Sequence, residues 1–173
     1  PTPKEMYPSK DMTWVEVTGD ITKVLCGRSR PIHFRGVTTV VSKLFNLAQP
    51  DRAYFGQKDA QQVQVIKRMV KDLFFNVQLR IMPIVREADG LAKSSRNTYL
   101  SSEERQAGLV LSRSLRQAET LFQQGERNGA ELVEIVREMI AAEPLSEIDY
   151  VEIYELPDLT PLAGKLAGPC LLA

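Results

Sequence analysis

The sequence predicts an α/β protein in which a partial, Rossmann-like parallel β-sheet with its helices is followed by a small α+β domain. Helix-like and strand-like segments alternate, with short connections, from Val37 to Pro83, which is the order that builds parallel sheets. After Pro83 the pattern changes to a polar stretch, two amphipathic helices and two short strands. We therefore expect one domain over residues 1–84 and a second over residues 85–173, the second truncated at its C-terminal end.

The first domain is read from its hydrophobic spacing. Apolar residues at 37, 40, 41, 44, 45 and 48 have helical spacing, and Pro50 closes that helix. The other expected segments are a strand over Met12–Val17, a helical turn over Asp20–Leu25, a basic loop over Gly27–Phe34, a buried strand over Ala53–Phe55 that ends at Gly56, a helix carrying Val63, Ile66, Val70 and Leu73, and a strand over Val77–Ile81.

The second domain begins with a polar loop over Arg86–Thr98. Ser101 and Glu104 form a capping-box signature, which predicts the start of a long helix reaching about Gln124, where Gly125 breaks it. The remaining expected segments are a helix over Ala130–Ala142 and strands over Ile148–Tyr154 and Leu166–Leu172.

Composition excludes several function classes. The chain carries 22 basic and 22 acidic residues, so we expect neither a nucleic-acid partner nor an anionic membrane. No apolar run approaches the roughly 20 residues that a membrane helix needs. Cys26 and Cys170 stand alone, without metal-ligand spacing, so no side-chain metal site is expected and a reduced, cytoplasmic protein is favoured.

The turn Gly56-Gln57-Lys58-Asp59 is the first candidate binding segment. It joins the end of a strand to the start of a helix, which is where open parallel sheets bind ligands. Lys58 could reach a phosphate, and Asp59 could either cap the helix or help to position Mg²⁺. The alternative is an ordinary strand–helix turn. Gln61 and Gln62 follow, with solvated helix surface favoured over a substrate contact.

Lys93, Ser94, Ser95 and Arg96 form the second candidate segment, because two hydroxyls and a guanidinium beside Gly90 suit an anion. A polar surface loop is the alternative. Val85 reads as the last residue of a buried strand, and Asp89 as a turn former. His33, the single histidine, is more often structural than catalytic in such a context. The two segments together predict a site for one triphosphate.

These segments in order resemble one family, the AMP-forming pantoate–β-alanine ligases or pantothenate synthetases. The matching residues are Gly27–Val37, Lys43–Asn46, Gln49–Gln62, Arg86–Asn97 and Tyr99–Ser101. The resemblance covers almost the whole chain and is strongest from Arg28 to Arg105. It implies a Rossmann-like fold of the nucleotidylyltransferase superfamily with a small C-terminal lid, and usually a homodimer.

The resemblance also implies site roles. Gly56, Gln57, Lys58 and Asp59 match an ATP-binding segment, and Val85 matches a position whose backbone meets adenine. Lys93, Ser94, Ser95 and Arg96 match a mobile phosphate-binding segment, and Gln62 matches a glutamine that binds pantoate. Lys58 and Arg96 would offset phosphate charge, with Mg²⁺ entering alongside ATP. This sequence departs from the usual family residues at Gln57, Ala60 and Lys93.

The implied reaction condenses (R)-pantoate with β-alanine through a pantoyl adenylate, releasing pyrophosphate and AMP. The family opens with a His-x-x-His segment that serves adenylation, and no such segment occurs in these residues. We therefore expect a piece of a longer ligase that is nearly inactive by itself. The alternatives are another nucleotidylyltransferase of the superfamily and a non-catalytic nucleotide-binding module. A homodimer could form through the edge of the strand expected at Met12–Val17.

Overall fold

The computed structural model describes all residues, 1–173, which divide into two compact units. The first unit is Pro1–Pro83 and the second is Ile84–Ala173. Each has its own buried hydrophobic residues. None of the helices is both long and apolar enough to cross a lipid bilayer.

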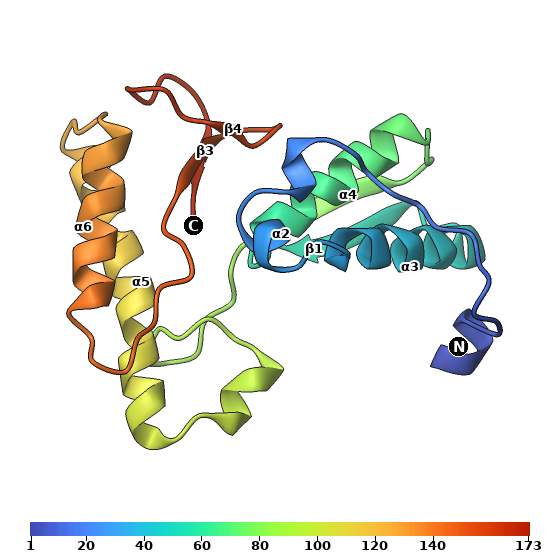
Figure 1. The fold of residues 1–173 in the computed structure, drawn as a ribbon, viewed down its shortest axis with the longest axis horizontal. Helices are drawn as coiled ribbons and strands as arrows, with labels where there is room; N and C mark the ends of the chain where they lie inside the picture. The colour runs from blue at the N-terminus through green and yellow to red at the C-terminus, as the bar shows by residue number, and fades with distance from the viewer. The chain divides into compact units, whose positions relative to one another are not determined.

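The first unit is built around two parallel strands and two long helices (Figure 1). Strand β1 pairs with β2 in parallel register, with Arg52 opposite Gln78 and Gly56 opposite Met82. The elements are α1 (Pro3–Met6), the 3₁₀ turn η1 (Asp20–Thr22), α2 (Cys26–Ser29), α3 (His33–Ala48), β1 (Arg52–Gly56), α4 (Ala60–Asp72) and β2 (Gln78–Met82). The helix α4 is the crossover that parallel pairing requires.

Helix α3 packs against α4 and starts four residues earlier than its apolar spacing predicts. Phe34 is 2% exposed and lies on the same helical face as Thr38, Ser42 and Phe45, which are also buried. The polar members of this face are satisfied internally, since the Ser42 hydroxyl lies 3.1 Å from the Met69 sulfur of α4. Burial of Phe34 therefore extends the helix back to His33.

The strand expected over Met12–Val17 is wrong, because this segment has no partner strand. Its backbone is instead held by hydroxyl groups of α3. The Val15 N–H donates to Thr39 Oγ1 at 3.0 Å, and the Val15 carbonyl accepts from Thr38 Oγ1 at 2.5 Å. Because no strand forms here, a dimer interface through the edge of this strand has no structural basis.

The basic loop expected over Gly27–Phe34 is wrong in part, since Cys26–Ser29 forms the short helix α2. Gly27 permits this turn to lie against the preceding segment, because a Cβ atom at Gly27 would stand 2.1 Å from the Thr22 carbonyl oxygen. The expectation of a buried β1 is also wrong, because Tyr54 at its centre is 62% exposed. Its side chains alternate between partly buried and exposed positions.

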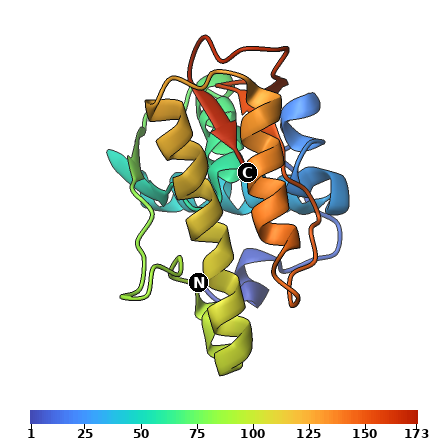
Figure 2. The same ribbon diagram turned by 90° about the vertical axis from the view of Figure 1, so that its left-hand side faces the viewer.

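The second unit contains two long helices and a small antiparallel sheet. Helices α5 and α6 lie side by side in both views (Figures 1 and 2), and both contribute to one core with Val151. The sheet order is β4-β3-β5. The elements are the 3₁₀ turn η2 (Ser95–Tyr99), α5 (Ser102–Gln123), α6 (Gly129–Ala141), β3 (Ile153–Glu155), β4 (Thr160–Pro161) and β5 (Cys170–Leu172).

The capping box that begins α5 is confirmed. Ser101 Oγ accepts the Glu104 N–H at 3.1 Å, and the Glu104 carboxylate accepts the Ser101 N–H at 2.7 Å. Gly125, with φ +109°, follows the end of the helix. These groups satisfy donors that a helix N-terminus leaves unpaired.

The two strands expected in the second unit form but are shorter than their hydrophobic pattern predicts, and a third strand, β4, joins them. Strand β3 begins at Ile153 rather than Ile148, although Glu152 and Ala173 still exchange two backbone hydrogen bonds at 2.8 and 2.9 Å. The Val151 carbonyl accepts from the Arg137 guanidinium at 3.1 Å. The strand expected to end at Val85 is also absent, and Val85 is 65% exposed. The fold class itself, an α/β protein with a parallel sheet and a small antiparallel sheet, is confirmed.

Candidate functional site

The turn between β1 and α4 presents Lys58 and Asp59 to solvent. The Gln57 N–H continues the strand pairing by donating to the Met82 carbonyl at 2.8 Å. Asp59 then takes a left-handed conformation, with φ +74° and ψ +43°, and α4 begins at Ala60. This places the turn at the carboxyl end of β1 and the amino end of a 13-residue helix, where backbone N–H groups attract anions.

The interpretation of Asp59 as a side-chain helix cap is wrong. An N-cap side chain reaches the helix from an extended backbone, whereas the left-handed backbone of Asp59 leaves its side chain without a capping hydrogen bond. Its carboxylate instead lies 3.3 Å from the Lys58 ammonium, and the two side chains are 62% and 42% exposed, respectively. Both charges are thus accessible to a ligand.

The adjacent glutamines occupy different environments. Gln61 is only 6% exposed, and its amide nitrogen donates to the carbonyls of Ile21 and Val24 at 3.1 and 2.7 Å. Its amide oxygen is buried without a hydrogen-bond partner. Solvated surface is therefore wrong for Gln61, which ties α4 to the η1 segment. Gln62, the next residue, is partly exposed.

His33 lies in the same electrostatic environment as Asp59. Partial burial lowers the pKa of His33, the Arg30 charge lowers the pKa further, and the Asp59 carboxylate acts in the opposite direction. The ring packs near Phe34, with centroids 5.1 Å apart. Burial and the Arg30 charge therefore favour the neutral form of the His33 ring.

In the second unit, residues 86–92 form a tight hairpin-like turn. Arg86 and Ala92 form an isolated antiparallel bridge, and the Gly90 N–H donates to the Glu87 carbonyl at 2.9 Å. Gly90 has φ +98°, a conformation that favours glycine. Asp89 Oδ1 accepts the Leu91 N–H at 3.1 Å, which confirms Asp89 as a turn former.

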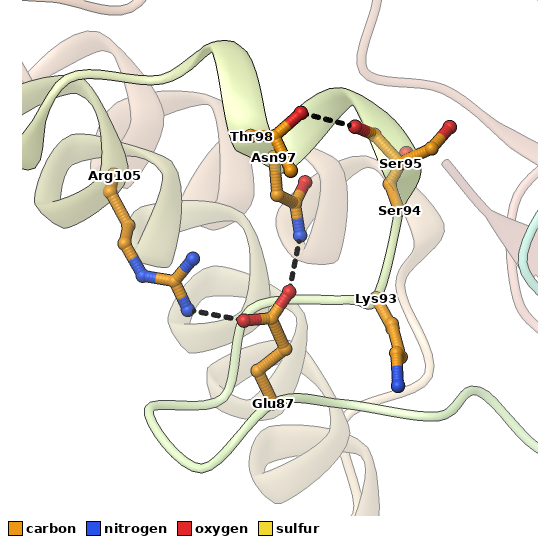
Figure 3. Close-up of a pocket in the computed structure, with 7 residues that line it drawn as sticks. All are labelled: Glu87, Lys93, Ser94, Ser95, Asn97, Thr98 and Arg105. Atoms are coloured by element: carbon orange, nitrogen blue, oxygen red, sulfur yellow. Dashed lines mark hydrogen bonds and ion pairs between the residues drawn. The ribbon is translucent and has the colours of Figure 1, made fainter.

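A cavity of about 710 Å³ opens beside this turn (Figure 3). Lys93, Ser94 and Ser95 line it from the second candidate segment, so the structure brings three of the four predicted residues together. The complete lining is Glu87, Lys93, Ser94, Ser95, Asn97, Thr98 and Arg105. Ser94 also begins the η2 turn, because its hydroxyl accepts the Arg96 N–H at 3.3 Å.

Arg96 and Val85 are predicted site residues that do not line this cavity. Arg96 lies in η2 and is exposed. Val85 is exposed and contributes its carbonyl, which accepts the Lys93 N–H at 2.9 Å. Lys58 lies in the first unit and residues 93–96 lie in the second, and their common role in binding one triphosphate stays a prediction.

Arg105 is a cavity residue that sequence reasoning missed. Its guanidinium donates from Nε to Asp89 at 2.7 Å and from Nη2 to Glu87 at 2.7 Å. Figure 3 shows Arg105, Glu87 and Asn97 in one connected row, in which the Asn97 amide donates to Glu87 Oε1 at 2.8 Å. The only sequence signal for this role is that an arginine stands near the start of the helix that follows an acidic turn.

These contacts favour the ionised carboxylates. The Asn97 amide, followed by Arg105, holds the pKa of Glu87 below its ordinary value. The Leu91 N–H, followed by Arg105, does the same for the pKa of Asp89. Hydrogen bonds to the charged form are the general cause of such lowered pKa values. The cavity wall is therefore an ordered ion network with two serine hydroxyls and Lys93 beside it.

Comparison with known proteins gives this arrangement a family. All 173 residues match the family described as Pantoate-beta-alanine ligase. The chain is 57% identical to the pantothenate synthetase of Pelotomaculum thermopropionicum and 58% identical to that of Heliobacterium modesticaldum, each over 100% of this chain and 61% of the relative. The chain thus spans about three fifths of the length of these curated relatives.

Solved structures agree with the sequence matches. The pantothenate synthetase of Thermus thermophilus superposes with a TM-score of 0.91 at 46% identity, covering 97% of this chain and 60% of that protein. The pantoate-beta-alanine ligase of Francisella tularensis, complexed with beta-gamma ATP and beta-alanine, has a TM-score of 0.62 at 35% identity, covering 79% of this chain and 50% of that protein. The chain therefore belongs to the pantoate–β-alanine ligase family.

Proposed function

We propose that the gene product containing these residues condenses (R)-pantoate with β-alanine to form pantothenate, at the expense of ATP. The observation that carries this proposal is the family match over the whole of residues 1–173. It is supported by the cationic and hydroxyl-rich character of the two candidate segments and by the relative whose crystal structure is complexed with beta-gamma ATP and beta-alanine.

The chemistry proceeds in two steps. A pantoate carboxylate oxygen attacks the α-phosphorus of ATP, forming a mixed anhydride and expelling pyrophosphate. The β-alanine amine then attacks the activated carbonyl, forms the amide, loses a proton and expels AMP. Because the anhydride is already activated, the protein has to align the reactants and offset phosphate charge.

Each predicted residue has a role in this proposal. Lys58 and Arg96 would stabilise phosphate charge, helped by the Ser94 and Ser95 hydroxyls and by Lys93. The proposed ATP contacts are Gly56, Gln57, Lys58, Asp59, Val85, Lys93, Ser94, Ser95 and Arg96. Gln62 would bind pantoate, and the exposure of Gln62 beside the buried Gln61 supports the choice between these two glutamines.

Mg²⁺ would accompany ATP and neutralise part of its phosphate charge. The accessible Asp59 carboxylate is an oxygen ligand of the kind that Mg²⁺ accepts, directly or through water. A cytoplasmic location and a homodimer complete the proposal, the first supported by the wide separation of the only two cysteines, Cys26 and Cys170, in the sequence.

Substrate dependence tests this function. The gene product should exchange labelled pyrophosphate into ATP only when pantoate is present, and should release AMP when β-alanine is then added. Exchange that needs no pantoate would indicate a different nucleotidylyltransferase. Binding of ATP without any exchange would indicate a nucleotide-binding module, and either result would overturn the proposal.

A further inference from the structure

We propose that Arg105 is a positioning residue for the phosphate-binding segment Ser94–Arg96, acting through Glu87 and Asn97. This inference rests on the proposed function and adds a residue that is not among the proposed ligands. Arg105 stands on the first turns of α5, whereas the segment it would position lies before that helix, in and around η2.

The first link joins α5 to the turn at residues 86–92. Arg105 uses two nitrogens on two different carboxylates, with Nε donating to Asp89 and Nη2 to Glu87, both at 2.7 Å. Its Nη2 also lies 2.6 Å from Asp89. The three side chains are between 27% and 31% exposed, so this ion network is partly shielded from water. A planar guanidinium fork fixes such a geometry better than a single ammonium.

The second link joins Glu87 to the η2 turn. While one oxygen of Glu87 accepts from Arg105, the other accepts the Asn97 side-chain amide at 2.8 Å. That amide also donates to the Ala92 carbonyl at 3.1 Å. Asn97 is tied into η2 by its backbone too, because its N–H donates to Ser94 and its carbonyl accepts from Leu100. The position of Ser94–Arg96 therefore depends on Glu87.

Charge gives Arg105 a second effect on the same segment. Glu87 lines the cavity together with Lys93, Ser94 and Ser95, and an uncompensated carboxylate there would repel a phosphate. Arg105 supplies the compensating charge. Arg105 Nε donates to Asp89 and Nη2 donates to Glu87. We therefore assign Arg105 to positioning and charge compensation rather than to direct contact with ATP.

Steady-state kinetics of pantoate-dependent pyrophosphate exchange test this role in the gene product. In Arg105→Gln we expect the KM for ATP to rise by at least about tenfold while the KM for pantoate stays within about twofold. Arg105→Lys should recover part of the loss, because it restores the charge without the fork. The matched control is Arg113→Gln, the same change at an exposed position of α5, with both KM values unchanged. An unchanged KM for ATP in Arg105→Gln would overturn the inference.

Asn97→Ala provides an independent variant, which removes the second link and leaves the ion network in place. It should raise the KM for ATP as Arg105→Gln does, and the double variant should be no worse than the more affected single variant, because both act through one chain of contacts. Fully additive effects would contradict the proposed connection.

Hydrogen exchange separates failure of this inference from failure of the proposed function. If the unaltered protein shows no pantoate-dependent exchange of pyrophosphate into ATP, the proposed function fails. The positioning role can still be measured by hydrogen exchange. The Asn97 and Leu100 amides, bonded within η2, should exchange faster in Arg105→Gln than in Arg113→Gln. Equal hydrogen-exchange rates of these amides in the two variants would overturn the positioning role.

Discussion

Lys58 carries the most specific charge prediction at the scale of single residues. Its ammonium lies 3.3 Å from the Asp59 carboxylate, and its side chain is 42% exposed, so the ammonium can turn to a phosphate. Lys58→Ala should lower kcat/KM for pantoate-dependent exchange by roughly 10²–10³, the usual cost of removing one preorganised charge-stabilising group. Lys67→Ala, an exposed lysine of α4, is the matched control. Equal rates in the two variants would refute the phosphate role of Lys58.

Glu87 and Asp89 predict a pH effect on stability. Because their folded-state pKa values lie below the ordinary values of 4.5 and 3.8, the unfolded chain binds their protons first as pH falls. Their stabilising contribution is therefore complete above the unfolded pKa values and is lost as pH falls through the folded ones. The thermal midpoint should drop between about pH 5 and pH 3, and Glu87→Gln should reduce that drop. An identical pH dependence in the variant would contradict this account.

Residue types predicted the candidate segments, but not the backbone that presents them. The strand–glycine–lysine order indicated where the β1–α4 turn lies. It did not reveal the left-handed conformation of Asp59, because aspartate adopts that region only in particular surroundings. Likewise, the sequence does not distinguish the burial of Gln61 from that of Gln62. Only the carbonyls of Ile21 and Val24, 40 and 37 residues earlier, account for the burial of Gln61.

At the scale of elements, helices were predicted better than strands. The apolar spacing of α4 and the capping box of α5 are local signals, and both helices form close to where those signals place them. Strand formation needs a partner that the local sequence does not specify. Met12–Val17 alternates like a strand, yet its backbone bonds to hydroxyls of α3, and Ile148–Tyr154 pairs over only its last residues.

Helix packing in the second unit gives a stability prediction at this scale. Leu132 of α6 is 3% exposed in the core, whereas Leu111 of α5 is 54% exposed. Leu132→Ala should lower the free energy of unfolding by about 2–5 kcal/mol through lost burial and a residual cavity. Leu111→Ala should change it by no more than about 0.5 kcal/mol. Denaturant unfolding of both variants measures the difference, and similar losses would contradict the assigned core.

At the scale of the whole molecule, the order of elements proved more informative than any single motif. Helix, strand, helix and strand with short connections predicted the parallel pairing of β1 and β2, which the structure confirms. Several motifs in a fixed order then indicated the family, and the match over residues 1–173 confirms it. The Arg105 network stayed hidden because its members are separated along the chain by a turn, a loop and η2.

We propose that both candidate segments bind the same nucleotide, and a hydrogen-exchange footprint tests this proposal most directly. The gene product would be compared with and without a non-hydrolysable ATP analogue and Mg²⁺. We expect the analogue to slow exchange at residues 56–60 and also at residues 93–97, while α6 stays unchanged. Slowed exchange at only one of these segments, or at neither, would contradict the claim.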